Sequence, residues 1–190
     1  TSSVGGDAQK SFPSITSEQA ILNRNNKPFK GDLDKIRERR IIRVLVSYCK
    51  TNYFFDQGQP RGFEYELMKA YEKFLNKNEK SRYAKTKMIF VPVPFNQLFK
   101  ALKQGRGDIA AASLTITPER RKIVNFTKPY IPRVHEIVVL NKKVKDVQSV
   151  EDLSNKMVYV RKGSSYLTHL RAFNKTLKKM NRPPIVIKES

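Results

Sequence analysis

The segment from Ser113 to Arg120 holds the residues whose types and spacing best suit ligand binding. Thr117 followed by Pro118 is typical of a helix start, because a threonine hydroxyl caps free backbone N–H groups and proline suits the first helical position. Arg120 then falls in the first turn, where its forked guanidinium and the positive end of the helix dipole both favour a carboxylate. Ser113 and Thr115 alternate along the chain, so both hydroxyls can face one side. The segment predicts a site for a small carboxylate-bearing ligand.

Two further groups could contribute to such a site. Gly163, Ser164 and Ser165 stand between a β-type run and a helix-type run, where backbone N–H groups and hydroxyls can bind an anion. They do not form a phosphate-binding loop, since the spacing of that motif is missing. Tyr53 begins a run of three aromatic residues in an expected loop. We expect Tyr53 to be the ring that touches the ligand, because its hydroxyl gives it a polar end.

Each group also has a simpler structural interpretation. Thr117 could serve only as a helix cap, with Arg120 paired to an acidic residue on the surface. Ser164 is ordinary N-cap material for the following helix. Aromatic rings in a loop, Tyr53 included, often anchor that loop to the core. These alternatives remain open from the residues alone.

Arrangements that would indicate catalysis or metal binding are not found. His135, expected in a strand, and His169, expected on a helix surface, have no His or Cys at metal-ligand spacing. Glu64 and Glu66 are two residues apart and so lie on different faces of a helix, which makes them a poor acid/base pair. Cys49 follows an apolar run and is expected to be a small buried residue. We therefore expect no catalytic residue, metal or cofactor in this sequence.

The elements that position these groups alternate between β-type and helix-type runs. After a short helix that opens near Gly31 with Asp32 as its cap, we expect strands and helices in turn at 41–47, 63–76, 87–93, 96–105 and 108–113. Asn96 is the expected cap of the second long helix. This order calls for a mostly parallel sheet, in which ligands bind outside the carboxyl ends of the strands. The loop at Tyr53 and the segment beginning at Ser113 both lie at such ends.

The second half of the chain repeats this alternation in a shorter form. We expect a strand at 135–140, a charged connector at 142–147, a capping box at 149–152, and then a strand, a helix and a strand at 157–161, 166–179 and 184–188. The predicted fold class is α/β, with two lobes of mostly parallel sheets and an incomplete second lobe. The expected divisions are a flexible leader at 1–30, a first lobe at 31–140, and a hinge with part of a second lobe at 141–190.

Composition limits the kinds of partner. The chain has 190 residues, 39% of them hydrophobic, and 38 basic against 17 acidic residues give a net charge of +21. Such a charge attracts polyanions, so a basic polyanion-binding protein is one alternative function. The basic residues are spread along the chain, however, which favours a generally basic surface over a specific nucleic-acid site.

Four motifs together resemble the family 3 extracellular solute-binding proteins, the amino-acid receptors of ABC importers and their relatives. In order, they are Gly62–Leu67, Leu102–Ala112, Leu114–Arg120 and Val124–Tyr130. The resemblance runs from about Gly31 to the end of the sequence. The sequence of 108–121 and that of 160–166 are most similar to the non-catalytic domain of membrane-bound lytic transglycosylase F, which precedes a peptidoglycan-cleaving domain.

The resemblance implies a periplasmic-binding-protein-like fold and a role for each candidate residue. Ser113 and Thr115 match positions that hold the amino or carboxylate group of the ligand. Arg120 matches the arginine that pairs with the ligand carboxylate. Ser165, together with Ser164, matches the hydroxyl of the second lobe that closes on the same carboxylate.

The expected function that follows from the resemblance is a solute-binding or sensory domain of an envelope lytic transglycosylase. Its ligand would be an amino acid or a muropeptide, with peptidoglycan as an associated partner and the periplasm or cell envelope as its location. Membrane association would come only through parts outside this chain, and a catalytic domain would lie beyond residue 190. An amino-acid receptor of an ABC importer is the alternative from the same family.

Overall fold

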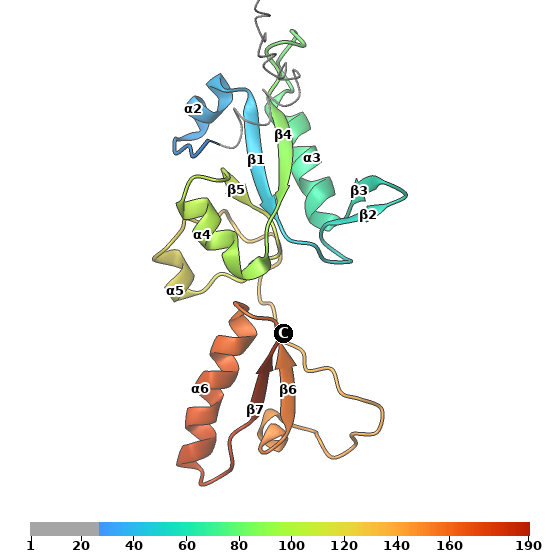
Figure 1. The fold of residues 1–190 in the computed structure, drawn as a ribbon, viewed down its shortest axis with the longest axis vertical. Helices are drawn as coiled ribbons and strands as arrows, with labels where there is room; N and C mark the ends of the chain where they lie inside the picture. The colour runs from blue at the N-terminus through green and yellow to red at the C-terminus, as the bar shows by residue number, and fades with distance from the viewer. Residues whose placement is uncertain (1–26) are drawn as a thin grey trace, which may run out of the picture.

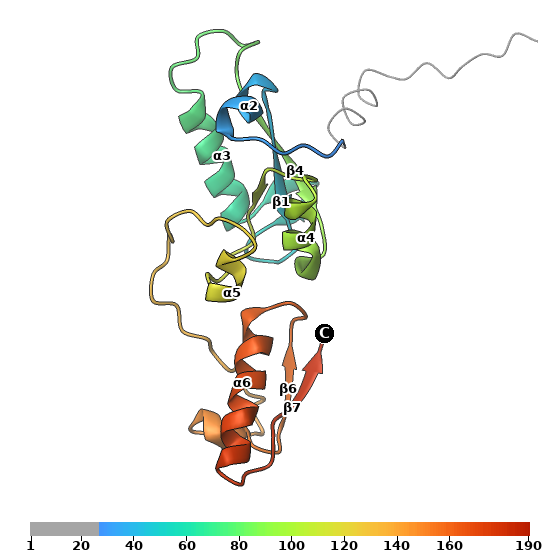
Figure 2. The same ribbon diagram turned by 90° about the vertical axis from the view of Figure 1, so that its left-hand side faces the viewer.

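The structure is a computed structural model that describes residues 27–190, and it places two lobes end to end (Figure 1). The first lobe carries most of the strands and helices, and the second contains β6 (Met157–Val160), α6 (Ser165–Lys179) and β7 (Val186–Glu189). A long extended connector, residues 122–149, joins them (Figures 1 and 2). Residues 1–26, most of the expected leader, lie outside the described part of the chain.

The first lobe is built on a three-stranded parallel sheet. Its strands are β1 (Ile41–Val46), β4 (Lys87–Pro92) and β5 (Ile109–Ala110), in the order β4-β1-β5. β1 is buried along almost its whole length, as a β-branched and apolar central strand should be. The prediction of a parallel sheet is therefore confirmed. β5 is shorter than the expected strand at 108–113, and three residues after it the chain enters the left-handed region at Ser113 (φ 49°).

Helices cover both faces of this sheet (Figure 2). The long helix α3 (Phe63–Leu75) packs Met68 and Tyr71 against the buried side of β1. On the opposite face α4 (Leu98–Lys103) buries Leu98 against β1 and β5 side chains. A short helix, α2 (Leu33–Glu38), precedes β1. Both faces of the sheet are thus shielded, which holds the carboxyl ends of its strands in a fixed place.

Two local predictions in this lobe were wrong. Asn96 lies inside a 3-10 turn, η1 (Phe95–Gln97), and Gln97 rather than Asn96 is the cap residue of α4. The expected loop after β1 contains a hairpin, β2 (Phe54–Asp56) with β3 (Gln59–Arg61). The two turn residues, Gln57 and Gly58, have positive φ of 47° and 76°. A two-residue turn with positive φ at both positions best matches the twist of paired strands.

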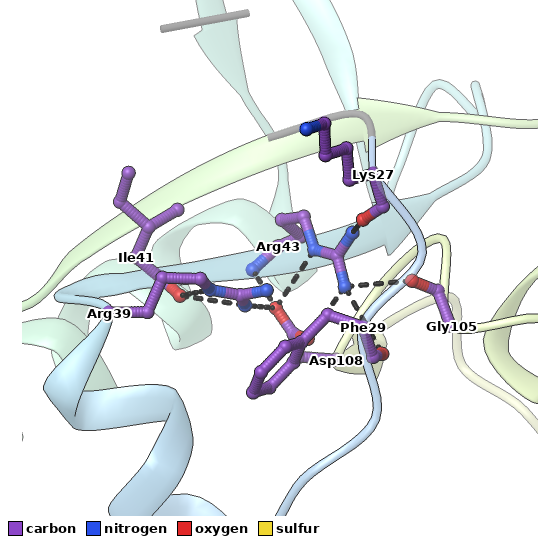
Figure 3. A network of polar contacts seen from close by, with 7 residues as sticks. All are labelled: Lys27, Phe29, Arg39, Ile41, Arg43, Gly105 and Asp108. Atoms are coloured by element: carbon purple, nitrogen blue, oxygen red, sulfur yellow. Dashed lines mark hydrogen bonds and ion pairs between the residues drawn. The ribbon is translucent and has the colours of Figure 1, made fainter. Parts of the chain in front are cut away.

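Buried charges fasten the start of the described chain to the first lobe (Figure 3). Arg43 and Asp108, at 1% and 2% side-chain exposure, form an ion pair of 3.0 Å. Arg39 adds a second contact to Asp108 at 2.6 Å. Arg43 also donates to the carbonyl groups of Gly105 (2.8 Å) and Lys27 (3.0 Å). Residues 27–30, which the sequence assigns to a leader, therefore pack against the first lobe.

The connector contains no strand, contrary to the prediction for 135–140. The residues of the run at 135–140 are all exposed, with Ile137 at 85% and Val139 at 90%. The run has the composition of a strand, but a strand also needs a neighbour for its backbone groups. In residues 27–190 no strand pairs with this run.

The second lobe is a single strand–helix–strand unit. It contains η2 (Val150–Leu153), β6 (Met157–Val160), α6 (Ser165–Lys179) and β7 (Val186–Glu189), with β6 and β7 parallel. The predicted capping box is confirmed, because the Ser149 and Asp152 groups bond reciprocally at the start of η2. Leu153, Leu177 and Ile185 form a small core between α6 and the two strands.

Candidate functional site at the junction of the lobes

The parallel sheets of the two lobes point their carboxyl ends at each other (Figure 1). β1 and β4 run from the far end of the first lobe toward the junction, and β6 and β7 run toward it from the second lobe (Figure 1). Helix α5 (Pro118–Arg121) lies over the N-terminal end of α6 in both views (Figures 1 and 2). Both sheets therefore present the ends at which α/β folds bind ligands to the same space.

Arg120 bridges the lobes. Its guanidinium donates to the carbonyl of Thr115 at 2.7 Å and to that of Gly163, in the second lobe, at 3.1 Å. The side chain is buried and lies 5.1 Å above the ring of Phe99. Burial lowers the pKa of Arg120, and the nearby Glu136 carboxylate acts in the opposite direction. The group keeps its positive charge, so it offers a buried cation to the junction.

Thr117 caps α5 as predicted, since its hydroxyl accepts from the Arg120 N–H at 3.3 Å. The helix is only one turn long, however. A macrodipole sums over aligned peptides, so a single turn contributes little to anion binding. The positive charge at this end of the site therefore comes from the Arg120 side chain, not from the helix.

Ser113 is held in place by Glu64 and Tyr130, which were not predicted to be site residues. Its N–H and hydroxyl both contact the buried carboxylate of Glu64, the hydroxyl at 3.1 Å. The Tyr130 hydroxyl donates to Glu64 at 2.8 Å and lies 3.2 Å from Ser113 Oγ. Burial raises the pKa of Tyr130, which keeps it a neutral donor. Glu64 stands in the first turn of a helix, and only the tertiary fold shows that it turns inward.

Hydroxyl groups from both lobes meet beside Arg120. Ser165 Oγ lies 3.3 Å from Thr115 Oγ1 across the junction and donates to the Glu136 carboxylate at 3.1 Å. Ser164, the cap residue of α6, is 7% exposed, and its hydroxyl has no hydrogen-bond partner within the described residues. A buried polar group without a partner is costly, and it is a natural donor to a bound molecule.

Gly163 brings the lobes into close approach. Its φ is +77°, and a Cβ at this position would lie 2.9 Å from the Cβ of Asn96 in the first lobe. Only glycine suits both the backbone and the space. This leaves its carbonyl within reach of Arg120.

A cavity of about 540 Å³ opens beside Asn96 between the strand ends of both lobes. Tyr48 and Phe95 line its apolar part, and Arg161 gives it a positive charge. Arg161 lies 4.0 Å above the Phe95 ring and donates to Ser47 at 2.8 Å. The volume is in the range of small-molecule sites.

Tyr53 does not join this group. It is 4% exposed and stacks on Phe90 at 5.7 Å within the core of the first lobe. Burial raises the pKa of its hydroxyl. The ring therefore has the anchoring role that was the alternative to a ligand contact, and Tyr48, which is exposed, lines the cavity instead.

Cys49 is only half-buried, which corrects the expectation of a buried residue. It follows β1 at the start of the loop, where the sheet no longer covers the chain. Its thiol lies 3.3 Å from the Thr51 hydroxyl, and this contact lowers the pKa of the thiol.

Within residues 27–190 no cluster of three or more His, Cys, Asp or Glu side chains could hold a metal ion. No helix in the same range is long and apolar enough to cross a membrane.

Comparison with known proteins gives one consistent result. Residues 41–183 match the family described as bacterial extracellular solute-binding proteins, family 3. The amino-acid-binding protein AabA of Dichelobacter nodosus is 29% identical over 136 residues, which cover 72% of this chain and 50% of that protein. The membrane-bound lytic murein transglycosylase F of Desulfosudis oleivorans is 31% identical over 139 residues, which cover 73% of this chain and 28% of that protein.

Among solved structures, an ancestral arginine-binding protein bound to arginine has a TM-score of 0.63 and 28% identity. The similarity covers 80% of this chain and 61% of that one. The predicted fold, an α/β binding protein with parallel sheets, is therefore confirmed. The chain spans half or less of the length of the two curated relatives, so it is similar to one part of each.

Proposed function

The chain belongs to the family 3 bacterial extracellular solute-binding proteins, and from this we infer that it binds a small carboxylate-bearing ligand of the amino-acid class between its two lobes. The observation that carries the proposal is the contact between Arg120, a buried cation of the first lobe, and the carbonyl of Gly163 in the second lobe. The next residue, Ser164, has a buried hydroxyl with no hydrogen-bond partner within the described residues. A carboxylate accepts hydrogen bonds only, so it satisfies both Arg120 and Ser164.

When a ligand binds, its carboxylate would replace backbone carbonyls as the hydrogen-bond acceptor of Arg120. Arg120 now donates to two backbone carbonyls, and a ligand carboxylate is a stronger acceptor because it is charged. Thr115 and Ser165 already lie within hydrogen-bond distance of each other across the junction. A ligand that contacts groups from both lobes binds the closed arrangement more tightly than the open one. This difference in affinity determines how far the ligand shifts the protein toward the closed arrangement.

The ligand's remaining atoms would occupy the adjacent cavity. Its walls combine the aromatic rings of Tyr48 and Phe95 with the positive charge of Arg161. Such a wall suits a polar or acidic side chain, or the next residue of a short peptide. This is compatible with both an amino acid and a muropeptide.

For the whole protein, we propose a sensory domain of an envelope lytic transglycosylase that recognises amino-acid or peptide parts of peptidoglycan. Support comes from the similarity to a murein transglycosylase over 73% of this chain. The periplasm or cell envelope is the proposed location, in keeping with the extracellular family.

An amino-acid receptor for transport is the second candidate. The similarity to AabA, named as an amino-acid-binding protein, and to an ancestral arginine-binding protein favours it. A ligand panel separates the two candidates. Preference for free amino acids would favour the receptor, and preference for muropeptides would favour the transglycosylase domain.

The test is calorimetry with a panel of free amino acids and muropeptides against the wild-type chain and Arg120→Ala. Arg121→Ala is the matched control, because it removes the same charge from the neighbouring exposed position. Loss of one charge-assisted hydrogen bond, about 1.5–3 kcal/mol, corresponds to a loss of affinity of roughly 10- to 150-fold for Arg120→Ala alone. Equal affinity in both variants would contradict the role of Arg120.

A further inference from the structure

Glu136 brings a carboxylate of the protein itself to the junction. It lies on the exposed connector, and its Oε1 accepts from the Ser165 hydroxyl at 3.1 Å. His169, one helical turn further along α6, places Nδ1 2.8 Å from the same oxygen. Ser165 in turn lies 3.3 Å from Thr115 of the first lobe. One carboxylate oxygen is thus bound at the end of α6, beside the hydroxyl pair that joins the lobes.

The charges around Glu136 show why a carboxylate is held there. Arg120 lies close enough for Glu136 to affect its pKa, and His169 contacts Glu136 directly. Glu119, on α5, is a further acid whose pKa His169 influences. The surroundings therefore contain two hydroxyls, an arginine and a histidine. Arg120 and the hydroxyls of Thr115 and Ser165 are also groups that the proposed function assigns to the carboxylate of a ligand.

We propose that Glu136 is a resident carboxylate that occupies part of the ligand carboxylate site and must leave before a ligand can bind. This deepens the proposed function and rests on it. Ser165 has a single hydroxyl proton, so it cannot donate to Glu136 and to a ligand at once. The contact with Glu136 is therefore autoinhibitory, and it also ties the connector to α6 while the site is empty.

The connector is suited to this movement. Within the described residues no strand pairs with 131–140, and all ten residues are exposed. Glu136 can swing into solvent without breaking a sheet or exposing a core side chain. A ligand that displaces it gains Ser165 as a donor and releases the connector, so ligand binding is linked to the path of the chain between the lobes.

The consequence for affinity follows from competition. A ligand binds only the fraction of molecules in which Glu136 has left, so its apparent affinity is reduced by that fraction. If the site is occupied by Glu136 about nine-tenths of the time, Glu136→Gln should bind a carboxylate ligand roughly tenfold more tightly. Glu38→Gln is the matched control, because it makes the same change of charge at an exposed position on α2.

The first test needs no natural ligand. Amide hydrogen exchange of 164–169 should be several-fold faster in Glu136→Ala than in the wild type or in Glu38→Gln. Sodium acetate, a bare carboxylate, should restore protection in Glu136→Ala at concentrations at which sodium chloride does not, and it should leave the wild type unchanged. Unchanged exchange in Glu136→Ala, or no rescue by acetate, would overturn the inference even if an amino-acid ligand is found.

The second test uses the calorimetric panel with Glu136→Gln. Tighter binding of the panel's best amino acid than in wild type supports the inference, and equal or weaker binding overturns it. If no panel member binds to the wild type, the proposed function fails on the Arg120 experiment. The acetate rescue then still decides whether Glu136 occupies a carboxylate site.

Discussion

In the first lobe the sheet lies between helices on both faces, whereas in the second lobe α6 covers one face of two strands and leaves Met157 and Tyr159 exposed on the other. Arg120 is therefore supported by the larger framework. Ser164 and Ser165 are carried by a helix whose core is small. We therefore expect the first lobe to provide a fixed half of the site, and the second lobe a half that responds more readily to ligand or mutation.

The largest expected effect concerns the buried ion pairs of the first lobe. Asp108→Asn removes the carboxylate that pairs with both Arg39 and Arg43, and should lower the free energy of unfolding by about 3–5 kcal/mol. Urea denaturation followed by circular dichroism measures this loss. Asp34→Asn, at an exposed position, is the control and should change little. Equal losses for the two variants would mean that the pair does not stabilise the fold.

Weakening the core of the second lobe should separate the behaviour of the two lobes. Leu177 is fully buried there, and Leu177→Ala should cost about 2–5 kcal/mol through lost contacts and a cavity. Hydrogen exchange should then accelerate in β6, α6 and β7 while β1 and β4 keep their protection. If protection falls to the same extent in both lobes, they unfold as one cooperative unit and the comparison fails.

The close contact between Gly163 and Asn96 of the first lobe can be tested by comparing alanine variants of Gly163 and of Gly58, a glycine with the same backbone conformation. Gly163 and Gly58 have φ of +77° and +76°, but only Gly163 faces a neighbour that a Cβ would strike. Alanine at either position should cost about 1–2 kcal/mol in backbone strain. Gly163→Ala should in addition push Asn96 away and reduce ligand affinity, measured by calorimetry. A similar loss of affinity in Gly58→Ala would contradict a specific role at the junction.

The smallest effect on stability is expected for Ser164. Its hydroxyl has no partner within the described residues, so Ser164→Ala should leave the free energy of unfolding unchanged or slightly higher. Ligand affinity should fall roughly 10- to 150-fold, as for one hydrogen bond to a charged carboxylate. Ser81→Ala, at an exposed position, should change neither quantity. Clear destabilisation by Ser164→Ala would show that the hydroxyl has a structural partner in solution.

Much of the framework could be predicted from the sequence. The strands at β1 and β4 and the helices α3 and α6 follow from apolar periodicity in long segments. The capping box at Ser149 follows from a local rule that needs no tertiary contact. Thr117 as the cap of α5 and Arg120 as a first-turn residue were predicted correctly for the same reason.

The parts that could not be predicted depend on residues distant in sequence. The run at 135–140 has strand composition but no pairing partner in the described chain, and the hairpin at 54–61 depends on pairing between two very short strands. Glu64 has an ordinary place at a helix start, and its burial is set by Ser113 and Tyr130. Glu136 lies in the run predicted as a strand at 135–140, and its contact with Ser165 depends on the tertiary fold.

The most direct test of the central claim compares one ligand with and without its carboxylate. The amino acid that binds best in the panel should be titrated beside the amine formed by its decarboxylation, against wild type and Arg120→Ala. We expect wild type to prefer the amino acid by at least about tenfold, as for a charge-assisted hydrogen bond, and Arg120→Ala to lose that preference. Equal binding of the amino acid and the amine by the wild type would contradict carboxylate recognition between the lobes.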